Sequence, residues 1–226
     1  KDASVGESQV KSRRRVVEHG EVFTAEREVN AMLDMVRQET ERIDSRFLEP
    51  ACGNGNFLAE VLRRKLAVAT RRCRRDAAVW ERDAFVAVAS LYGVELLEDN
   101  VAECRERLLG IVAGEWRSIC RSAGNPAFLD AAAYVLSRNI QCGDALTMKT
   151  AQGEPITFSE WSLVFGDKVK RRDYRLCDLL ESNEEAPSLF GSDGAGWGYD
   201  EETASPVAPV VAEFAPTSIF EVVDNG

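Results

Sequence analysis

The sequence predicts an α/β protein built around a parallel sheet, and three observations lead to this prediction. Residues 46–58 have the pattern of a buried strand that breaks into a loop with two glycines and continues into a helix. Two later apolar segments, 91–96 and 139–146, each contain a carboxylate near the expected strand end. Segments with helical periodicity separate the three, and strands that alternate with helices form parallel sheets. We therefore expect three carboxylates at one edge of the sheet, where open α/β folds bind ligands.

The residues before the first strand predict a polar lead and one helix. Residues 1–15 lack hydrophobic periodicity and are expected to be a disordered basic lead. The basic patch at residues 11–15 has two interpretations, a solvated arm, which we favour, and a phosphate contact. Residues 26–41 place apolar side chains on one helical face, and Thr24 is expected to be the N-cap of that helix.

The glycine loop contains the most specific motif of the chain. Gly53 and Gly55 permit a positive φ and a close approach of the backbone to a ligand, and Glu49 can accept hydrogen bonds from an amine or a hydroxyl. A bare Gly-x-Gly also occurs in ordinary turns from a strand to a helix. The run from Glu49 to Leu58, EPACGNGNFL, nevertheless resembles the S-adenosylmethionine loop of amino-group DNA methyltransferases. The resemblance is to the adenine-modifying subunits of type I and fused type II restriction-modification systems.

This resemblance implies a Rossmann-like S-adenosylmethionine-dependent methyltransferase fold, with S-adenosylmethionine as the cofactor. In that family a Gly-x-x-(Phe/Tyr)-Thr-Pro segment upstream of the glycine loop folds over the methionine part of the cofactor. Phe23 and Thr24 match this segment, and Ala25 replaces its proline. Around the loop, the cofactor contacts that the resemblance implies are Glu49, Pro50, Ala51, Gly53, Gly55 and Phe57.

The second and third predicted strands each end near one candidate ligand for the cofactor. Glu95 lies where nucleotide-binding α/β folds use a carboxylate to accept from the ribose hydroxyls, although a surface glutamate is the alternative. Asp144 can accept from an adenine amino group, a role that the family's Gly-Asp-Ala-Leu segment also implies. Leu96 and Ala145 are the adjoining cofactor contacts that we expect.

Residues 63–90 exceed the connection that a compact α/β unit needs, and they predict a basic helical insertion. A second helical stretch covers residues 77–90. The seven basic residues before it are Arg63, Arg64, Lys65, Arg71, Arg72, Arg74 and Arg75. Two interpretations stay open, a nucleic-acid-binding surface and a solvated helical face, because no interleaved aromatic residues support base reading.

The catalytic tetrapeptide of the resembled family, (Asn/Asp/Ser)-Pro-Pro-(Tyr/Phe), has no intact copy in this chain. Residues 125–128, Asn-Pro-Ala-Phe, precede the third strand instead of following it, and a helix start with an Asn cap explains them. The fourth strand is expected at residues 156–165, so that Asp167 takes the first position of the tetrapeptide. Both prolines are missing, and Lys170 stands where an aromatic residue would stack on a flipped base. We therefore assign no catalytic residue.

The net charge of −10 is concentrated near the end of the chain. Residues 181–226 contain ten acidic residues and no Lys or Arg, which leaves 28 acidic and 28 basic residues in 1–180. We expect residues 16–180 to form the cofactor-binding domain and residues 181–226 to be an acidic, low-complexity tail. Segments 207–211 and 219–223 add at most one or two edge strands, so the sheet is expected to be incomplete.

The remaining composition bears on the cellular setting. Six cysteines and one histidine are scattered without any Cys-x-x-Cys pair, which disfavours a zinc site or a disulfide framework. A reduced, cytoplasmic location is expected. No apolar run reaches the roughly 18 residues of a membrane span, and we expect neither a signal peptide nor a membrane association.

Together these features predict an S-adenosylmethionine-binding DNA methyltransferase for the adenine amino group, or a subunit of one, in a restriction-modification or phage-defence system. The expected partner is DNA, with target recognition supplied by a specificity subunit in a hetero-oligomer. The alternative is a catalytically inactive, methyltransferase-like regulatory module that binds the cofactor and acts through a partner. A methyltransferase for another substrate is the third hypothesis.

Overall fold

The computed structural model describes Arg15, residues 24–181 and residues 208–225. The helices are α2 (Glu26–Met35), α3 (Arg37–Thr40), α4 (Asn56–Arg72), α5 (Ala77–Ala89), α6 (Glu98–Ile119), η1 (Arg121–Ala123), α7 (Ala127–Asn139) and α8 (Leu176–Glu181). The strands are β1 (Phe47–Glu49), β2 (Leu91–Glu95), β3 (Ile140–Cys142), β4 (Thr157–Phe165), β5 (Lys168–Arg175), β6 (Ala212–Glu213) and β7 (Thr217–Ser218). The predictions for residues 1–14, for Phe23 and for residues 182–207 lie outside the described part of the chain.

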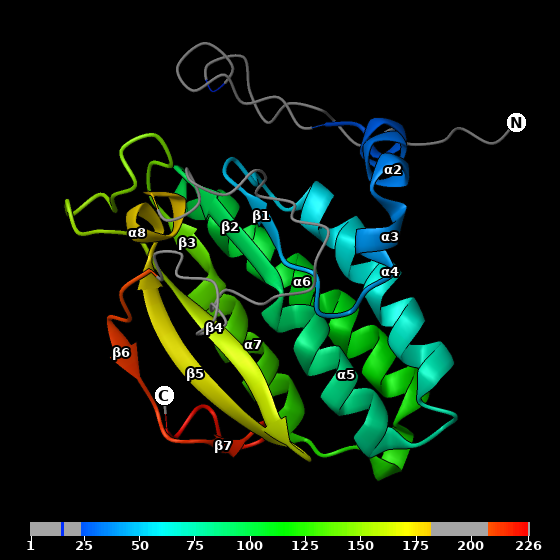
Figure 1. The fold of residues 1–226 in the computed structure, drawn as a ribbon. Helices are drawn as coiled ribbons and strands as arrows, with labels where there is room; N and C mark the ends of the chain where they lie inside the picture. Colours follow the sequence, from blue (N-terminus) through cyan, green and yellow to red (C-terminus); the bar gives the residue numbers. More distant parts are fainter. Residues whose placement is uncertain (1–14, 16–23, 182–207, 226) are drawn as a thin grey trace, which may run out of the picture.

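Strands β1, β2 and β3 form a parallel sheet in that order, which confirms the α/β class. Phe47 pairs with Leu91 at the start of β1, and Glu95 pairs with Cys142 at the end of β2. Figure 1 shows this sheet in the upper part of the molecule, with helices beside and below it. The parallel register brings the three carboxyl ends to the same edge.

Each crossover between these strands contains two helices instead of one. Helices α4 and α5 connect β1 to β2, and α6 and α7 connect β2 to β3. The 22 residues of α6 span about 33 Å, far more than a strand of three to five residues, so a second helix must return the chain to the next strand. The four helices pack on one another as a layer that extends beyond the sheet.

The expected insertion at residues 63–90 is therefore the end of α4 and the whole of α5, and it belongs to the core. Trp80 and Phe85 on α5 are at most 1% exposed, and their rings meet Phe128 and Trp161 edge to face. The basic residues differ in exposure. Lys65 is fully buried, and Arg64 is partly buried in ion pairs with Asp34 and Glu60. Arg63 is exposed, and so are the arginines of the α4–α5 turn, in which we include the last two residues of α4; they are Arg71, Arg72, Arg74 and Arg75.

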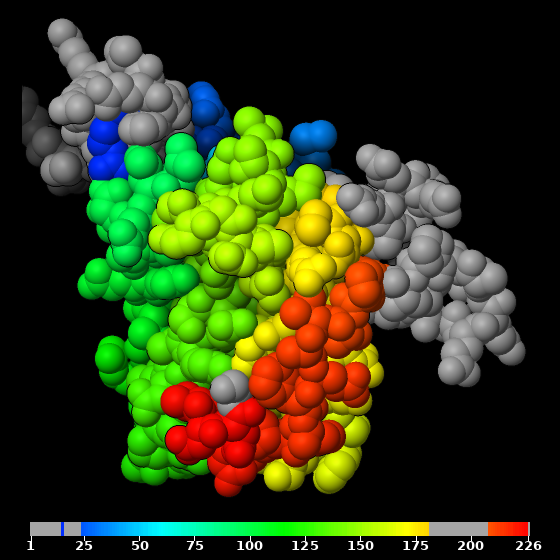
Figure 2. Space-filling model, turned by 90° about the vertical axis from the view of Figure 1, so that its left-hand side faces the viewer, coloured from blue at the N-terminus to red at the C-terminus, as the bar shows by residue number. Residues whose placement is uncertain are grey.

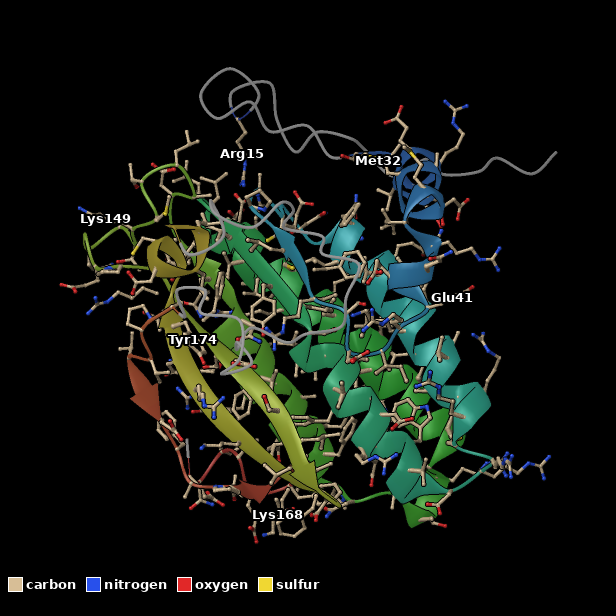
Figure 3. All side chains as sticks on the ribbon, viewed as in Figure 1. Arg15, Met32, Glu41, Lys149, Lys168 and Tyr174 are labelled. Carbon is tan, nitrogen blue, oxygen red and sulfur yellow. The ribbon has the colours of Figure 1, made fainter. Side chains whose placement is uncertain are left out.

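The prediction that residues 156–165 form a fourth parallel strand is wrong. Strand β4 pairs antiparallel with β5 in a second sheet, whose order is β4-β5-β6 with β7 also on β5. Gly166 adopts φ 57° in the turn between β4 and β5, a conformation that suits glycine and reverses the chain at once. Asp167 is consequently in a hairpin turn at the end of the molecule away from the carboxyl edge, where Lys168 is labelled in Figure 3.

A buried polar network joins the hairpin to α7. The Arg171 guanidinium donates to both carboxylate oxygens of Asp173 at 2.8 and 2.7 Å and to the Tyr134 hydroxyl at 2.7 Å. Arg138 of α7 also donates to Asp173, at 3.2 Å, and the Ser159 hydroxyl donates to it at 2.7 Å. Because every member has a partner, the network fixes the hairpin on the helix in one orientation.

The last described residues pack on β5 and are not part of a tail. Ile219 and Val222 are at most 1% exposed and belong to the main core, and Figure 2 shows residues 208–225 lying along the surface of the hairpin. The expected edge strands exist, but they are shifted to β6 at residues 212–213 and β7 at 217–218. Within the described residues no helix combines the length and the apolar character needed to cross a membrane.

Candidate functional site

The candidate site is the carboxyl edge of the parallel sheet. Glu49 ends β1, Glu95 ends β2, and Asp144 follows β3 by two residues. The ladder continues past β3, since the Gly143 N–H donates to the Glu95 carbonyl at 2.9 Å. None of these three carboxylates forms an ion pair with another described residue. The expected gathering of three acceptors at one edge is what the strand register produces.

The glycine loop is held tightly against β2 and α6. The Cys52 N–H donates to the Val94 carbonyl at 3.0 Å, and Gly55 adopts φ 85°. A Cβ atom at Gly55 would lie 2.6 Å from the Cys104 sulfur, and one at Gly93 would lie 2.9 Å from the Cys52 sulfur. The loop therefore requires glycine at position 55 for two reasons, the left-handed backbone and the packing on α6.

Cys104 is a site residue that the sequence did not single out. Its thiol interacts with that of Cys52, and this hydrogen bond together with burial raises the pKa of Cys52. Cys52 consequently stays protonated, and both sulfurs pack under the glycine loop. The only sequence signal for Cys104 was its apolar spacing on α6, which does not reveal a contact with a loop some fifty residues earlier in the chain.

Glu95 joins the glycine loop to the start of α6. One carboxylate oxygen, Oε2, accepts from the Gly53 N–H at 2.9 Å, and Oε1 accepts from the Leu97 N–H at 3.0 Å and from Asn100 at 3.4 Å. The side chain is buried, at 9% exposure. The alternative of a surface glutamate is wrong, because Glu95 is buried and organises the loop. Its role as a ribose acceptor stays a prediction. Oε2 keeps one lone pair for a further donor.

Glu49 lies in an environment that disfavours its charged form. Burial raises the pKa of Glu49, and a hydrogen bond from the Ala51 backbone partly opposes this effect. Carboxylates whose pKa is raised by desolvation are frequent in functional sites, since a cationic ligand would restore the charged form. Pro50 and Ala51, which follow it, are exposed on the same edge.

Asp144 closes the turn after β3. Its carboxylate accepts from the Leu146 N–H at 2.8 Å and from the Thr147 hydroxyl at 3.1 Å. Leu96 and Leu146 are 55% and 92% exposed beside these carboxylates, and Ala145 is half-buried. The edge therefore combines acceptors with free apolar side chains, of which Leu146 was not predicted.

The backbone of Thr24 contacts the first residue of α4, and the prediction that Thr24 caps α2 is wrong. The N-cap of α2 is Ala25, which makes no side-chain hydrogen bond, because the extended φ and ψ of −66° and 145° occur one residue later than expected. The Thr24 carbonyl accepts from Asn56 at 3.4 Å, and Arg107 of α6 donates to the other side of that amide at 2.6 Å. Phe57, the next residue, packs partly buried against the core.

The two candidate copies of the catalytic tetrapeptide both have structural roles. Pro126, directly before α7, already has helical φ and ψ of −56° and −31°, so Asn125 is the residue that caps the helix; its side chain accepts from the Ala127 N–H at 3.1 Å. Asp167 accepts from the Ser218 hydroxyl at 2.5 Å, and Lys170 forms an ion pair with Glu213 of β6. Neither segment is at the carboxyl edge. Helix α6 carries the chain away from that edge before Asn125, and Asp167 lies in the β4–β5 turn.

Comparisons with protein-family models, with curated proteins and with solved structures each give no match. In the described part of the chain, no three or more His, Cys, Asp or Glu residues are grouped so that they could hold a metal ion.

Proposed function

We propose that the carboxyl edge binds S-adenosylmethionine and that the chain has a Rossmann-like methyltransferase fold, as the cofactor-binding part of a DNA adenine methyltransferase. The observation that supports this proposal is the set of three carboxylates, Glu49, Glu95 and Asp144, around a glycine loop and without an ion-pair partner among the described residues. A cofactor with an ammonium group, two ribose hydroxyls and an adenine amino group supplies donors for three separate acceptors.

The residues present suit such a ligand in chemistry and in order along the edge. Glu49 lies beside the glycine loop and would accept from the ammonium group, whose charge also favours the ionised carboxylate. Glu95 would accept from a ribose hydroxyl through Oε2, and Asp144 would accept from the adenine amino group. Leu96, Ala145 and Leu146 would flank the adenine ring. When bound, S-adenosylmethionine supplies a methyl group on a sulfonium that an amine nucleophile can attack.

A second candidate function, a cofactor-binding module without its own catalytic segment, is favoured by the position of Asp167. This residue lies in the β4–β5 turn and is bonded to Ser218. Transfer to a base requires a flipped amine held in line with the methyl group and a surface on which the base can stack. The described residues place no such segment at the carboxyl edge, so methyl transfer would depend on a partner that supplies it.

Photochemical cross-linking with methyl-labelled S-adenosylmethionine tests the proposed binding. We expect label in the intact chain, loss of label with S-adenosylhomocysteine as competitor, and no loss with ATP or NAD. Equal competition by ATP or NAD would contradict the assignment, because it would indicate a general nucleotide site.

Methyl transfer is tested by incubating the same labelled cofactor and the intact chain with mixed-sequence duplex DNA. We expect little incorporation by the chain alone. Strong incorporation would refute the dependence on a partner. Removal of residues 181–226 is unsuitable for this assay, since it would take Ile219 and Val222 out of the core.

A further inference from the structure

The end of β4 exposes three consecutive apolar side chains. Leu163, Val164 and Phe165 are 40%, 51% and 68% exposed, whereas Phe158 and Trp161 earlier in the same strand are buried. A strand that packs on one face alternates between buried and exposed residues. This segment leaves both faces open, and contiguous exposed apolar residues of this kind mark interaction surfaces.

The same segment is at the open edge of its sheet. The strand order places β4 outermost, with β5 on its inner side only. The pairing with β5 joins Leu163 to Val169 and Phe165 to Lys168, with a shift of register at Val164. Among the described residues, the backbone of residues 162–165 makes no backbone hydrogen bond outside this pairing. An unpaired strand edge with free N–H and C=O groups can accept a further strand from another chain.

A groove of about 380 Å³ lies beside this edge. Leu163, Val164 and Phe165 form one side of it, Val86 of α5 contributes an apolar contact, and Arg72 and Arg82 contribute guanidinium groups. The groove and the glycine loop lie at opposite ends of α4, whose 17 residues span about 25 Å. It is therefore separate from the proposed cofactor site.

The groove itself is balanced in charge, because Asp44 and Asp83 line it together with Arg72 and Arg82. The unpaired positive charge lies next to it, on the α4–α5 turn that contains Arg72. Arg82 pairs with the adjacent Asp83 at 3.0 Å, and Asp44 is 3.9 Å from Arg42. By contrast, the exposed arginines of the α4–α5 turn have no ion-pair partner among the described residues; they are Arg71, Arg72, Arg74 and Arg75. The Asp76 carboxylate fixes this turn by accepting from the N–H groups of Ala78 and Val79.

We propose that this surface binds an extended acidic segment of a partner protein, which adds as a strand to the edge of β4. Its backbone pairs with residues 162–165, its apolar side chains cover Leu163 to Phe165, and its carboxylates meet the arginines of the α4–α5 turn. The exposed apolar residues favour a protein segment over a nucleic acid, because a phosphate backbone would leave them in contact with charged groups instead of covering them.

The test uses the full chain and a fluorescein-labelled peptide of about ten residues in which valine and glutamate alternate. Fluorescence anisotropy is expected to show saturable binding that weakens about tenfold or more in Phe165→Glu and in Arg72→Glu. Val210→Glu and Arg117→Glu are the matched controls, because both residues are exposed elsewhere on the molecule and should leave the affinity unchanged. Thermal melting of each variant verifies that it is folded.

Two further peptides identify the mode of binding. A version with lysine in place of glutamate should not bind, and a version N-methylated at alternate residues should lose binding because it cannot pair with a strand. Equal binding of either peptide overturns the proposal, as does the absence of saturation with the acidic peptide. Tighter binding of duplex DNA that depends on Arg72 but not on Phe165 would overturn it in favour of a nucleic-acid surface. Dimerisation of the chain that is lost in Phe165→Glu would overturn it in favour of a second copy.

Discussion

The two sheets of this protein use their charged side chains in opposite ways. At the edge of the parallel sheet, Glu95 and Asp144 accept mainly from backbone N–H groups and form no ion pair with a described residue. In the antiparallel sheet, Asp173 is enclosed by Arg171, Arg138 and Ser159. Both arrangements satisfy the carboxylate, but only the first leaves its charge uncompensated.

This difference separates a candidate site from a structural joint. A carboxylate held by N–H groups keeps lone pairs and negative charge that a ligand can use. In a carboxylate paired with two guanidinium groups, the lone pairs are occupied and the charge is compensated. Substitutions in the antiparallel network should therefore affect stability alone. Substitutions at the parallel edge should affect ligand affinity, and those at Glu95 or under the glycine loop, where side chains also hold the loop in place, should affect both affinity and stability.

The largest effect is expected for Asp173→Ala. The change leaves the buried Arg171 guanidinium and the partly exposed Arg138 without their carboxylate, at a cost of about 3–5 kcal/mol in the free energy of unfolding. Urea denaturation measures this loss. A matched variant that also carries Arg171→Met should recover part of the stability, and a cost below about 1 kcal/mol for Asp173→Ala would show that the network is not a joint.

Gly55→Ala is expected to cost about 2–4 kcal/mol, because the new Cβ meets the Cys104 sulfur and the residue must keep a left-handed φ. Combining it with Cys104→Ala should reduce the cost by removing the sulfur. Equilibrium denaturation of both single variants and of the double variant gives this interaction energy. Strictly additive costs would contradict the packing of the loop on α6.

The buried Lys65 beneath the parallel sheet predicts a pH dependence of stability. Burial lowers the pKa of Lys65 to about 7, while its amine donates to the carbonyl of Ile43 at 3.2 Å and to the Ser90 hydroxyl at 2.5 Å. Between pH 7 and about 10 the unfolded chain holds a proton on this lysine that the folded chain lacks, so the lysine makes stability rise with pH.

The measurement is the difference in unfolding free energy between the wild type and Lys65→Met at pH 7 and at pH 9. The wild type should gain about 2 kcal/mol over the variant across this interval. The difference isolates the lysine from the buried thiols of Cys52 and Cys120, whose raised pKa values make stability fall at alkaline pH in both proteins. A constant or decreasing difference would show that Lys65 stays charged in the fold.

The smallest effect is expected for Asn125→Ala, which removes the side-chain cap of α7. It should lower stability by about 1 kcal/mol and leave cofactor affinity unchanged. A variant of normal stability that no longer methylates DNA in the presence of a partner would instead assign this segment to catalysis. Thermal denaturation and calorimetry on the same sample distinguish the two outcomes.

The parallel sheet was predictable from the sequence because its signals are local. The carboxylates at residues 49, 95 and 144 follow short apolar runs, and the Asn125 cap precedes a proline and a helical period. The partner of β4 was not predictable, since a nine-residue segment with strand-forming residues indicates a strand without specifying its neighbour. The contact of Gly55 with Cys104 likewise depends on tertiary packing, which no spacing along the chain reveals.

Calorimetric titration of S-adenosylhomocysteine into the intact protein tests the central claim most directly. We predict saturable binding to one site in the micromolar range, weakened by about 1–3 kcal/mol in Glu95→Ala and in Asp144→Ala and unchanged in Asp167→Ala. The absence of saturable heat with the folded wild-type protein, or an equal loss in Asp167→Ala, would contradict a cofactor site at the carboxyl edge of the parallel sheet.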